Sequence, residues 1–334
     1  MRRWKLMLAA VFAATPAAAA QNRAATPAPA VPPQPASGRA APAKPAPAAE
    51  TKPAPVLRLA WKTPFDPDAF RIAVADTVGD GLQRIVAVSA PGGRGARLTI
   101  YRWRDGAYAA EWSADLGAGQ GAIAVGRLEA GQQAARIVTP GGWYAWDGST
   151  YARHDFQRSV LPVGVLRGRN GDDTLLLREN GDFRACRLDP GAADPLVTVD
   201  TPTDDARCAW GVLHATPAEL GAALPAEYAL CGVMGLMQWP GLPRTARVLA
   251  RWQAKGEGAG GAIVLVRELG GEPLREIGRG PAFEGRVVDF AFGDLRESGE
   301  TGIVALVANP SGKARTLVVL APAARRSSSS RRAP

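Results

Sequence analysis

The chain has 334 residues, of which 46% are hydrophobic and 21% are charged, so it can bury a sizeable core. Its formal net charge is +9, but residues 1–20 carry +3, residues 21–56 carry +3 and residues 325–334 carry +4, which leaves residues 57–324 at −1. A near-neutral body lacks the clustered Lys and Arg side chains that follow a nucleic-acid backbone, so nucleic acid is disfavoured as a partner. With two histidines and three cysteines, multi-histidine metal cages and four-cysteine zinc sites are excluded by counting.

The first twenty residues have the three parts of a secretory signal peptide. Arg2, Arg3 and Lys5 form a positive start, residues 6–14 are apolar, and small residues end at Ala20, after which we expect cleavage. The apolar stretch is much shorter than the ~20 residues that cross a bilayer, and no other segment reaches that length, so we expect no membrane span. The sequence therefore predicts a periplasmic or secreted protein.

Two further segments predict disorder at the ends of the mature chain. Residues 21–55 are rich in Ala and Pro and have almost no large side chains to bury. Because proline-rich chain favours an extended polyproline II conformation, this linker is either a spacer that holds the body off a surface or a low-complexity terminus that adds solubility. Residues 323–334 combine four arginines with a run of serines and predict a basic tail that touches anionic surfaces weakly. Residues 56–322 remain as one domain.

The body repeats one phrase, an apolar run that is followed after a polar turn by a second apolar run. The first runs are Ile72–Asp76, Ile123–Leu128, Pro162–Leu166, Trp210–Leu213 and Phe290–Leu295. The second runs are Arg84–Val88, Arg136–Thr139, Thr174–Leu177, Tyr228–Cys231 and Ile303–Val307. The glycines at positions 126, 164, 211 and 293 suggest a period near 40 to 50 residues, which is typical of a propeller blade built from short strands.

The first repeat has the full set of four strands, at residues 71–76, 84–89, 98–103 and 108–112. The dipeptide at 105–106 is Asp-Gly, which predicts a hairpin turn because glycine accepts the positive φ that such turns need. Asp147–Gly148 and Asn180–Gly181 predict two further hairpins in the same way.

The length of the body then predicts an all-β propeller of about six four-stranded blades. Five and seven blades are the alternatives, because residues 236–280 fit the repeat badly. The last repeat offers only three strands, so we expect a strand near residues 56–62 to pair with it and close the ring without an open sheet edge.

The phrase from Val74 to Val86, VADTVGDGLQRIV, resembles the one that opens each blade of exported bacterial FG-GAP/VCBS-type propellers, the integrin-alpha-like group, and Phe292–Gly299 is a weaker copy. In that family an aspartate-rich loop often binds calcium, so the resemblance implies Asp76 and Asp80 as calcium ligands. Here Val78 stands at the middle ligand position and Arg84 at the position of the final acidic residue, whereas calcium prefers six to eight oxygens. The alternative is that the aspartates fix the turn through hydrogen bonds to the backbone.

No other motif assigns chemistry to the chain. The sequence has no nucleophile elbow, no His-Glu-x-x-His and no phosphate-binding loop, so we expect no catalytic residues and, apart from the calcium alternative, no cofactor. The segment 256–261 has a dinucleotide-type glycine spacing, but it precedes a strand where that motif should follow one. His154 and His214 are each interpreted as ordinary surface or core histidines.

The cysteines and tryptophans give two further candidates. In an oxidising compartment three cysteines permit one disulfide, and Cys208 with Cys231 is the favoured pair because both are placed on neighbouring strands of one repeat. Pairing of Cys186 with either of them, or no disulfide, are the alternatives. Trp239 lies in an irregular segment and is the best candidate for an exposed binding contact, whereas most other tryptophans occupy strand positions and are expected to be structural.

These observations favour an exported, non-catalytic propeller that serves as a binding or scaffold module of the cell envelope, with a protein or a glycan as partner. One alternative is a glycan-active propeller enzyme whose carboxylates gather at the central channel, for instance Asp172, Asp173, Asp204 and Asp205. The other alternative is a calcium-stabilised adhesion domain.

Overall fold

The computed structural model describes residues 57–93, 95–168, 173–200, 208–215, 233–237, 246–253, 260–267, 275–295 and 299–323. These residues form 21 β-strands and one short 3-10 turn, Pro91–Gly93, and every paired strand is antiparallel to its neighbour. The chain is therefore all-β over the described ranges, as the sequence predicts. Within those ranges no helix is long and apolar enough to cross a membrane.

The strands fall into five strand groups, each of which begins with a strand near the centre of the molecule. Group 1 is a four-stranded sheet of β2 (Ala69–Ala75), β3 (Arg84–Ser89), β4 (Ala96–Arg104) and β5 (Ala107–Gly117). Group 2 is a four-stranded sheet of β6 (Ala124–Gly126), β7 (Arg136–Thr139), β8 (Gly142–Trp146) and β9 (Tyr151–Asp155). The strand boundaries of group 1 agree closely with those predicted for the first repeat.

Groups 3 and 4 share one nine-stranded sheet because their first strands pair with each other. Group 3 contains β10 (Leu161–Gly168), β11 (Asp173–Glu179), β12 (Asp182–Leu188) and β13 (Leu196–Thr198). Group 4 contains β14 (Cys208–Leu213), β15 (Met234–Met237), β16 (Ala246–Gln253), β17 (Gly260–Arg267) and β18 (Arg275–Arg279). The antiparallel ladder from β10 to β14 joins them.

Group 5 combines the two ends of the described chain. It contains β19 (Arg286–Gly293), β20 (Gly302–Ala308), β21 (Arg315–Pro322) and the N-terminal strand β1 (Leu57–Phe65). Leu57 lies opposite Pro322 and Phe65 lies opposite Arg315, so β1 is the outermost strand of this sheet. The predicted pairing between the N-terminal strand and the last repeat is thus confirmed.

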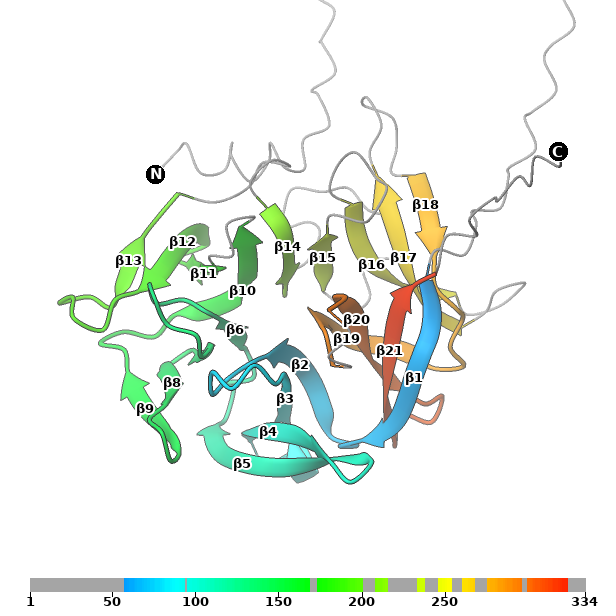
Figure 1. The fold of residues 1–334 in the computed structure, drawn as a ribbon, viewed down its shortest axis with the longest axis horizontal. Coiled ribbons are helices and arrows are strands. Elements are labelled where there is room, and N and C mark those ends of the chain that lie inside the picture. The colour runs from blue at the N-terminus through cyan, green and yellow to red at the C-terminus, as the bar shows by residue number, and fades with distance from the viewer. Residues whose placement is uncertain are drawn as a thin grey trace, which may run out of the picture.

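The first strands of the five groups are neighbours in a closed circuit. β2 contacts β6 and β19, β6 contacts β10, β10 pairs with β14, and β14 contacts β19. Figure 1 shows the sheets arranged around a common centre, near which β2, β6 and β19 lie, with the later strands of each sheet farther out.

The described residues form five strand groups, whereas the sequence predicts about six blades, with five or seven as the alternatives. The difference arises in group 4, where β15 to β18 extend the sheet that β14 begins and do not start a new group. Within this group the strand that pairs with β14 is Met234–Met237, whereas the sequence predicts the second strand at Tyr228–Cys231. Residues 228–231 themselves lie outside the described ranges.

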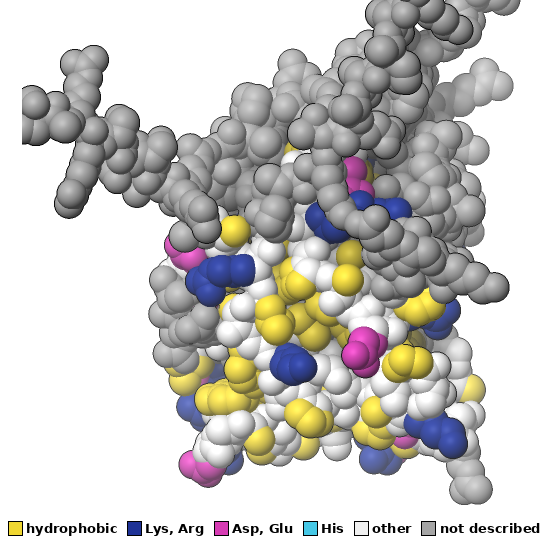
Figure 2. All heavy atoms as spheres, turned by 90° about the vertical axis from the view of Figure 1, so that its right-hand side faces the viewer, with side chains coloured by type: hydrophobic (Ala, Val, Ile, Leu, Met, Phe, Trp, Pro, Cys, Tyr) yellow, Lys and Arg dark blue, Asp and Glu magenta, His cyan; other side chains and the backbone are white. Residues whose placement is uncertain are grey.

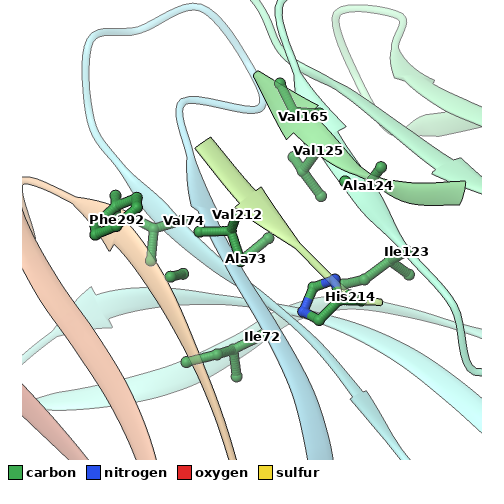
Figure 3. A pocket seen from close by; sticks show the side chains of 12 residues that line it. Ile72, Ala73, Val74, Ile123, Ala124, Val125, Val165, Val212, His214 and Phe292 are labelled. Carbon is green, nitrogen blue, oxygen red and sulfur yellow. The ribbon is translucent and has the colours of Figure 1, made fainter. Parts of the chain in front are cut away.

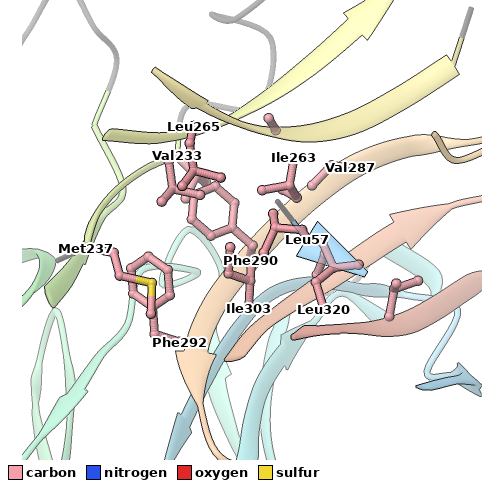
Figure 4. Packing of buried hydrophobic residues seen from close by; sticks show 14 of the residues in the cluster. Leu57, Val233, Met237, Ile263, Leu265, Val287, Phe290, Phe292, Ile303 and Leu320 are labelled. Atoms are coloured by element: carbon pink, nitrogen blue, oxygen red, sulfur yellow. The ribbon is translucent and has the colours of Figure 1, made fainter. Parts of the chain in front are cut away.

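The hydrophobic core lies between neighbouring groups. Four second strands, β3, β7, β15 and β20, are buried at every residue, because neighbouring groups pack on both of their faces. Between groups 4 and 5, Phe290 and Phe292 of β19 pack against Met237 and Leu265, and Leu57 of the N-terminal strand joins the same cluster (Figure 4). The N-terminal strand therefore contributes to the core as well as to the sheet.

Two glycines allow the first strands of groups 3 and 4 to pair. A Cβ atom on Gly164 of β10 would overlap the carbonyl oxygen of Val212. A Cβ atom on Gly211 of β14 would lie 2.8 Å from the carbonyl oxygen of Val165 and would overlap the side chain of Leu166. The direct β10–β14 ladder therefore requires a residue without a side chain at both positions.

We expect Gly164→Ala to lower the free energy of unfolding by about 1–3 kcal/mol, because the added methyl group pushes two backbones apart. Urea unfolding followed by tryptophan fluorescence measures the change. Gly191→Ala is the matched control, since its Cβ would meet only the Asp189 carboxylate, at 3.4 Å. Equal unfolding midpoints for the two variants would contradict the steric argument.

Candidate functional site

The aspartate loop of group 1 is organised by backbone hydrogen bonds. Asp76 accepts the N–H groups of Val78 at 3.2 Å and Gly79 at 2.7 Å through Oδ1, and the N–H group of Gly81 at 2.8 Å through Oδ2. Gly79 and Gly81 have φ angles of 82° and 83°, which only glycine adopts readily. Asp76 therefore holds the turn, in agreement with the second of the two sequence-based interpretations.

A buried arginine supplies the positive charge at this loop. Arg84 is 1% exposed, and its Nη1 and Nη2 atoms donate to the two carboxylate oxygens of Asp80 at 2.9 and 2.8 Å. Its Nε atom donates to Glu111 at 2.9 Å. The hydrogen bond from Arg84 is the main cause that lowers the pKa of Asp80 from 3.8 to about 2. The described residues contain no group of three or more His, Cys, Asp or Glu side chains that could hold a metal ion.

The first residue of the second strand is a buried charged residue in groups 1, 2 and 3. Arg84, Arg136 and Asp173 are each the first residue of the second strand in their group, and all three are buried. Arg136 donates to both oxygens of Glu129, at 2.6 and 2.8 Å. Asp173 accepts two hydrogen bonds from Arg167, at 2.7 and 2.9 Å. Since buried charges are costly unless they are paired, these contacts are part of the framework.

The remaining residues singled out in the sequence have different outcomes. Asp173 also accepts the backbone N–H of Arg127 at 2.7 Å, so this carboxylate joins groups 2 and 3. Asp172, Asp204, Asp205, Cys231 and Trp239 lie outside the described ranges, and the side chain of Cys208 is likewise outside them.

Cys186 is a buried free thiol, and burial raises its pKa to about 11, which makes it unreactive near neutral pH.

A small cavity lies at the centre, where the first strands meet. Its volume is about 40 Å³, and its walls come from all five groups (Figure 3). Ile72, Ile123, Val165, Val212 and Phe292 make the walls apolar, and His214 is the only titratable side chain among the described residues that line it. A cavity of this size has room for a few water molecules.

His214 and Asp289 form a buried pair beside this cavity. Asp289 is 0% exposed, and its Oδ1 atom lies 3.0 Å from Nε2 of His214. Its Oδ2 atom accepts the backbone N–H of Ile72 at 2.7 Å, so the carboxylate links groups 4, 5 and 1. This pair was not predicted from the sequence. The available signal was Asp289, the one acidic residue in the middle of the otherwise apolar run VVDFAFG.

An aromatic cluster lies at the surface between group 5 and group 1. Trp61 of β1 meets Trp103 of β4 edge to face, with ring centroids 5.0 Å apart, and Tyr108 of β5 lies 5.1 Å from Trp103. Trp103 is 43% exposed, whereas most tryptophans at strand positions were expected to be structural. We call Trp61, Trp103 and Tyr108 the aromatic surface.

On the face shown in Figure 2, charged side chains of one sign do not gather into a patch. Figure 2 shows hydrophobic side chains interspersed with separate Lys, Arg, Asp and Glu side chains on the face that lies at the right of Figure 1. This distribution agrees with the near-zero net charge of residues 57–324.

Comparison with known proteins gives no assignment. No protein-family model matches the chain, and no curated protein matches it. The resemblance of the Asp76 loop to FG-GAP/VCBS repeats therefore stays a prediction, and function must be argued from the geometry.

We expect the free energy that Asp80 contributes to be present in full above pH ~4 and to be lost as the pH falls toward 2. The reason is that its pKa is lowered from 3.8 to about 2, so folding favours the ionised carboxylate. Urea unfolding of the wild-type chain and Asp80→Asn between pH 2 and 5 measures this. The stability difference between the two proteins should shrink on acidification, and a difference that is constant with pH would contradict the ion-pair assignment.

Removal of divalent cations should leave the melting temperature unchanged, because Asp76 is occupied by backbone donors and Asp80 by Arg84. Thermal unfolding with EDTA, and then with millimolar calcium, is the measurement. An upward shift of several degrees with calcium would favour the adhesion-domain alternative.

Proposed function

We propose that the protein is an exported, non-catalytic β-propeller of five blades that acts as a binding module of the bacterial cell envelope. Five strand groups around a common centre, with β1 completing the last of them, support the propeller architecture. The signal peptide predicted at residues 1–20 and the linker predicted at 21–55 support export and presentation away from a surface.

The small size of the central cavity is the observation that carries this proposal. Pockets for small organic ligands are usually about 300–1,000 Å³, whereas this cavity measures about 40 Å³. Because β10 and β14 pair directly, two of the five first strands leave no gap between them. The space that the described residues leave at the centre is too small for a sugar ring, so we place a ligand of that size on the outer surface.

The buried carboxylates also favour binding over catalysis. The enzyme alternative needs two free carboxylates in a deep pocket, about 5–10 Å apart. Asp173 is occupied by Arg167 and by a backbone donor, and Asp289 is occupied by His214 and by another backbone donor. Neither carboxylate is available to attack or protonate a substrate.

We place the binding face at the aromatic surface and favour an envelope glycan as the ligand, with an envelope protein as the alternative. The C–H face of a sugar ring packs well on an exposed indole. Trp103 offers such a ring, and its contacts with Trp61 and Tyr108 hold it in place before binding. A ring that is already fixed loses little conformational entropy when the ligand arrives.

Trp103→Ala should weaken glycan binding at least tenfold, which corresponds to about 1.4 kcal/mol. Binding of the full chain to isolated cell-wall glycan and to an array of bacterial surface glycans measures the effect. The matched control is Leu59→Ala, which removes a side chain of similar exposure, 45%, from β1 outside the aromatic surface. Equal affinities for the two variants, or no glycan binding by the wild-type chain, would overturn the glycan assignment.

A further inference from the structure

The carboxylate of Asp289 determines which nitrogen of the His214 ring carries the proton. Asp289 is fully buried and accepts the N–H of Ile72 at 2.7 Å, and Arg71 is the nearest cation, with its Nη1 atom 4.0 Å from Oδ1. Nε2 of His214 lies 3.0 Å from one carboxylate oxygen and 3.3 Å from the other. Since a carboxylate only accepts hydrogen bonds, Nε2 carries the proton and donates it.

The other ring nitrogen is left without a partner. When Nε2 of a neutral histidine is protonated, Nδ1 is an acceptor with a free lone pair. Nδ1 of His214 is buried, the side chain is only 10% exposed, and this atom has no hydrogen-bond partner in the described structure. An unpaired buried acceptor is unfavourable, so each such atom in a native protein calls for a partner that the protein itself does not supply.

His214 lines the central cavity, and Figure 3 shows its ring among the apolar side chains that form the walls, near Ile72 and Ile123. We propose that this cavity is a binding site for one small neutral molecule with an O–H group, which donates its hydrogen bond to Nδ1 of His214. Two kinds of molecule supply such an O–H group, namely water and a short-chain alcohol. This site is separate from the aromatic surface and does not depend on the glycan proposal.

Other ligand classes fit the cavity less well. A metal ion would find one ring nitrogen and no cluster of further ligands among the described residues. A small anion would lie close to the carboxylate of Asp289, which repels it. A molecule with one donor and a short apolar body satisfies Nδ1 and the apolar walls together, and a volume of about 40 Å³ limits it to a few heavy atoms.

Nitrogen-15 NMR of the full chain tests the proposal without a destabilising variant. The chain has two histidines, so the spectrum of His154→Gln assigns the signals of His214. We expect the Nε2-protonated tautomer, because Nε2 faces the Asp289 carboxylate, with Nδ1 accepting a hydrogen bond. The nuclear Overhauser effect between the His214 ring and water then detects a bound water, and titration with ethanol detects an alcohol by a saturable shift of Nδ1.

Two controls make the outcome decisive. Xenon fills apolar cavities but donates no hydrogen bond, so it should not reproduce the ethanol shift of Nδ1. Val212→Ile adds one methyl group to the cavity wall and should weaken a saturable ethanol response at least tenfold, while His154 should not respond in the wild-type chain.

A water contact or a saturable ethanol shift supports the proposal and identifies the source of the hydroxyl group. An Nδ1-protonated ring overturns it. A ring without a water contact whose signals move only linearly with ethanol, as His154 would, overturns it as well.

Discussion

The close approach of the first strands at the centre is the constraint on which the rest of the structure depends. β10 and β14 are hydrogen-bonded to each other, which is possible only because Gly164 and Gly211 have no side chains at the points of contact. Elsewhere around the circuit apolar side chains fill the centre and leave about 40 Å³. Direct pairing of two first strands and apolar packing of the others leave little space among the described residues at the centre. This is why the proposed binding face is placed on the outer surface.

Buried charges link the strand groups where hydrophobic contact alone would not specify their positions. Asp173 joins group 3 to the backbone of group 2, and Asp289 joins group 5 to group 4 through His214 and to group 1 through Ile72. Hydrophobic contacts alone allow two sheets to shift relative to each other, whereas a buried carboxylate is stable only when its hydrogen-bond donors are in place. These residues thus favour one register between groups. Asp80 and Arg84 act within group 1, where they fix the loop between the first two strands.

The features predicted well from the sequence are local, and those missed are contacts between distant residues. The Asp105–Gly106 hairpin is confirmed by φ angles of 51° and 85°, and the strands of group 1 follow from alternation and turn residues. The glycines from which the period was inferred are not at equivalent positions, since Gly126 lies opposite the first residue of a second strand, whereas in β10 Arg167 has that place. The His214–Asp289 pair spans 75 positions, and no local pattern connects residues that far apart. The burial of Arg84 could not be predicted for a related reason, since its partner Glu111 comes from another strand.

The N-terminal strand connects closure of the ring to the proposed binding face. Leu57 lies opposite Pro322, so the predicted linker and the predicted basic tail leave the body from adjacent points. Trp61 lies four positions after Leu57, about 13 Å along an extended strand, and its ring meets Trp103 and Tyr108 of group 1. The aromatic surface therefore exists only while β1 is docked. A ligand that contacted both sides of this junction would bind only while β1 is docked, and it would therefore stabilise the docked strand by RT ln(1 + [L]/Kd).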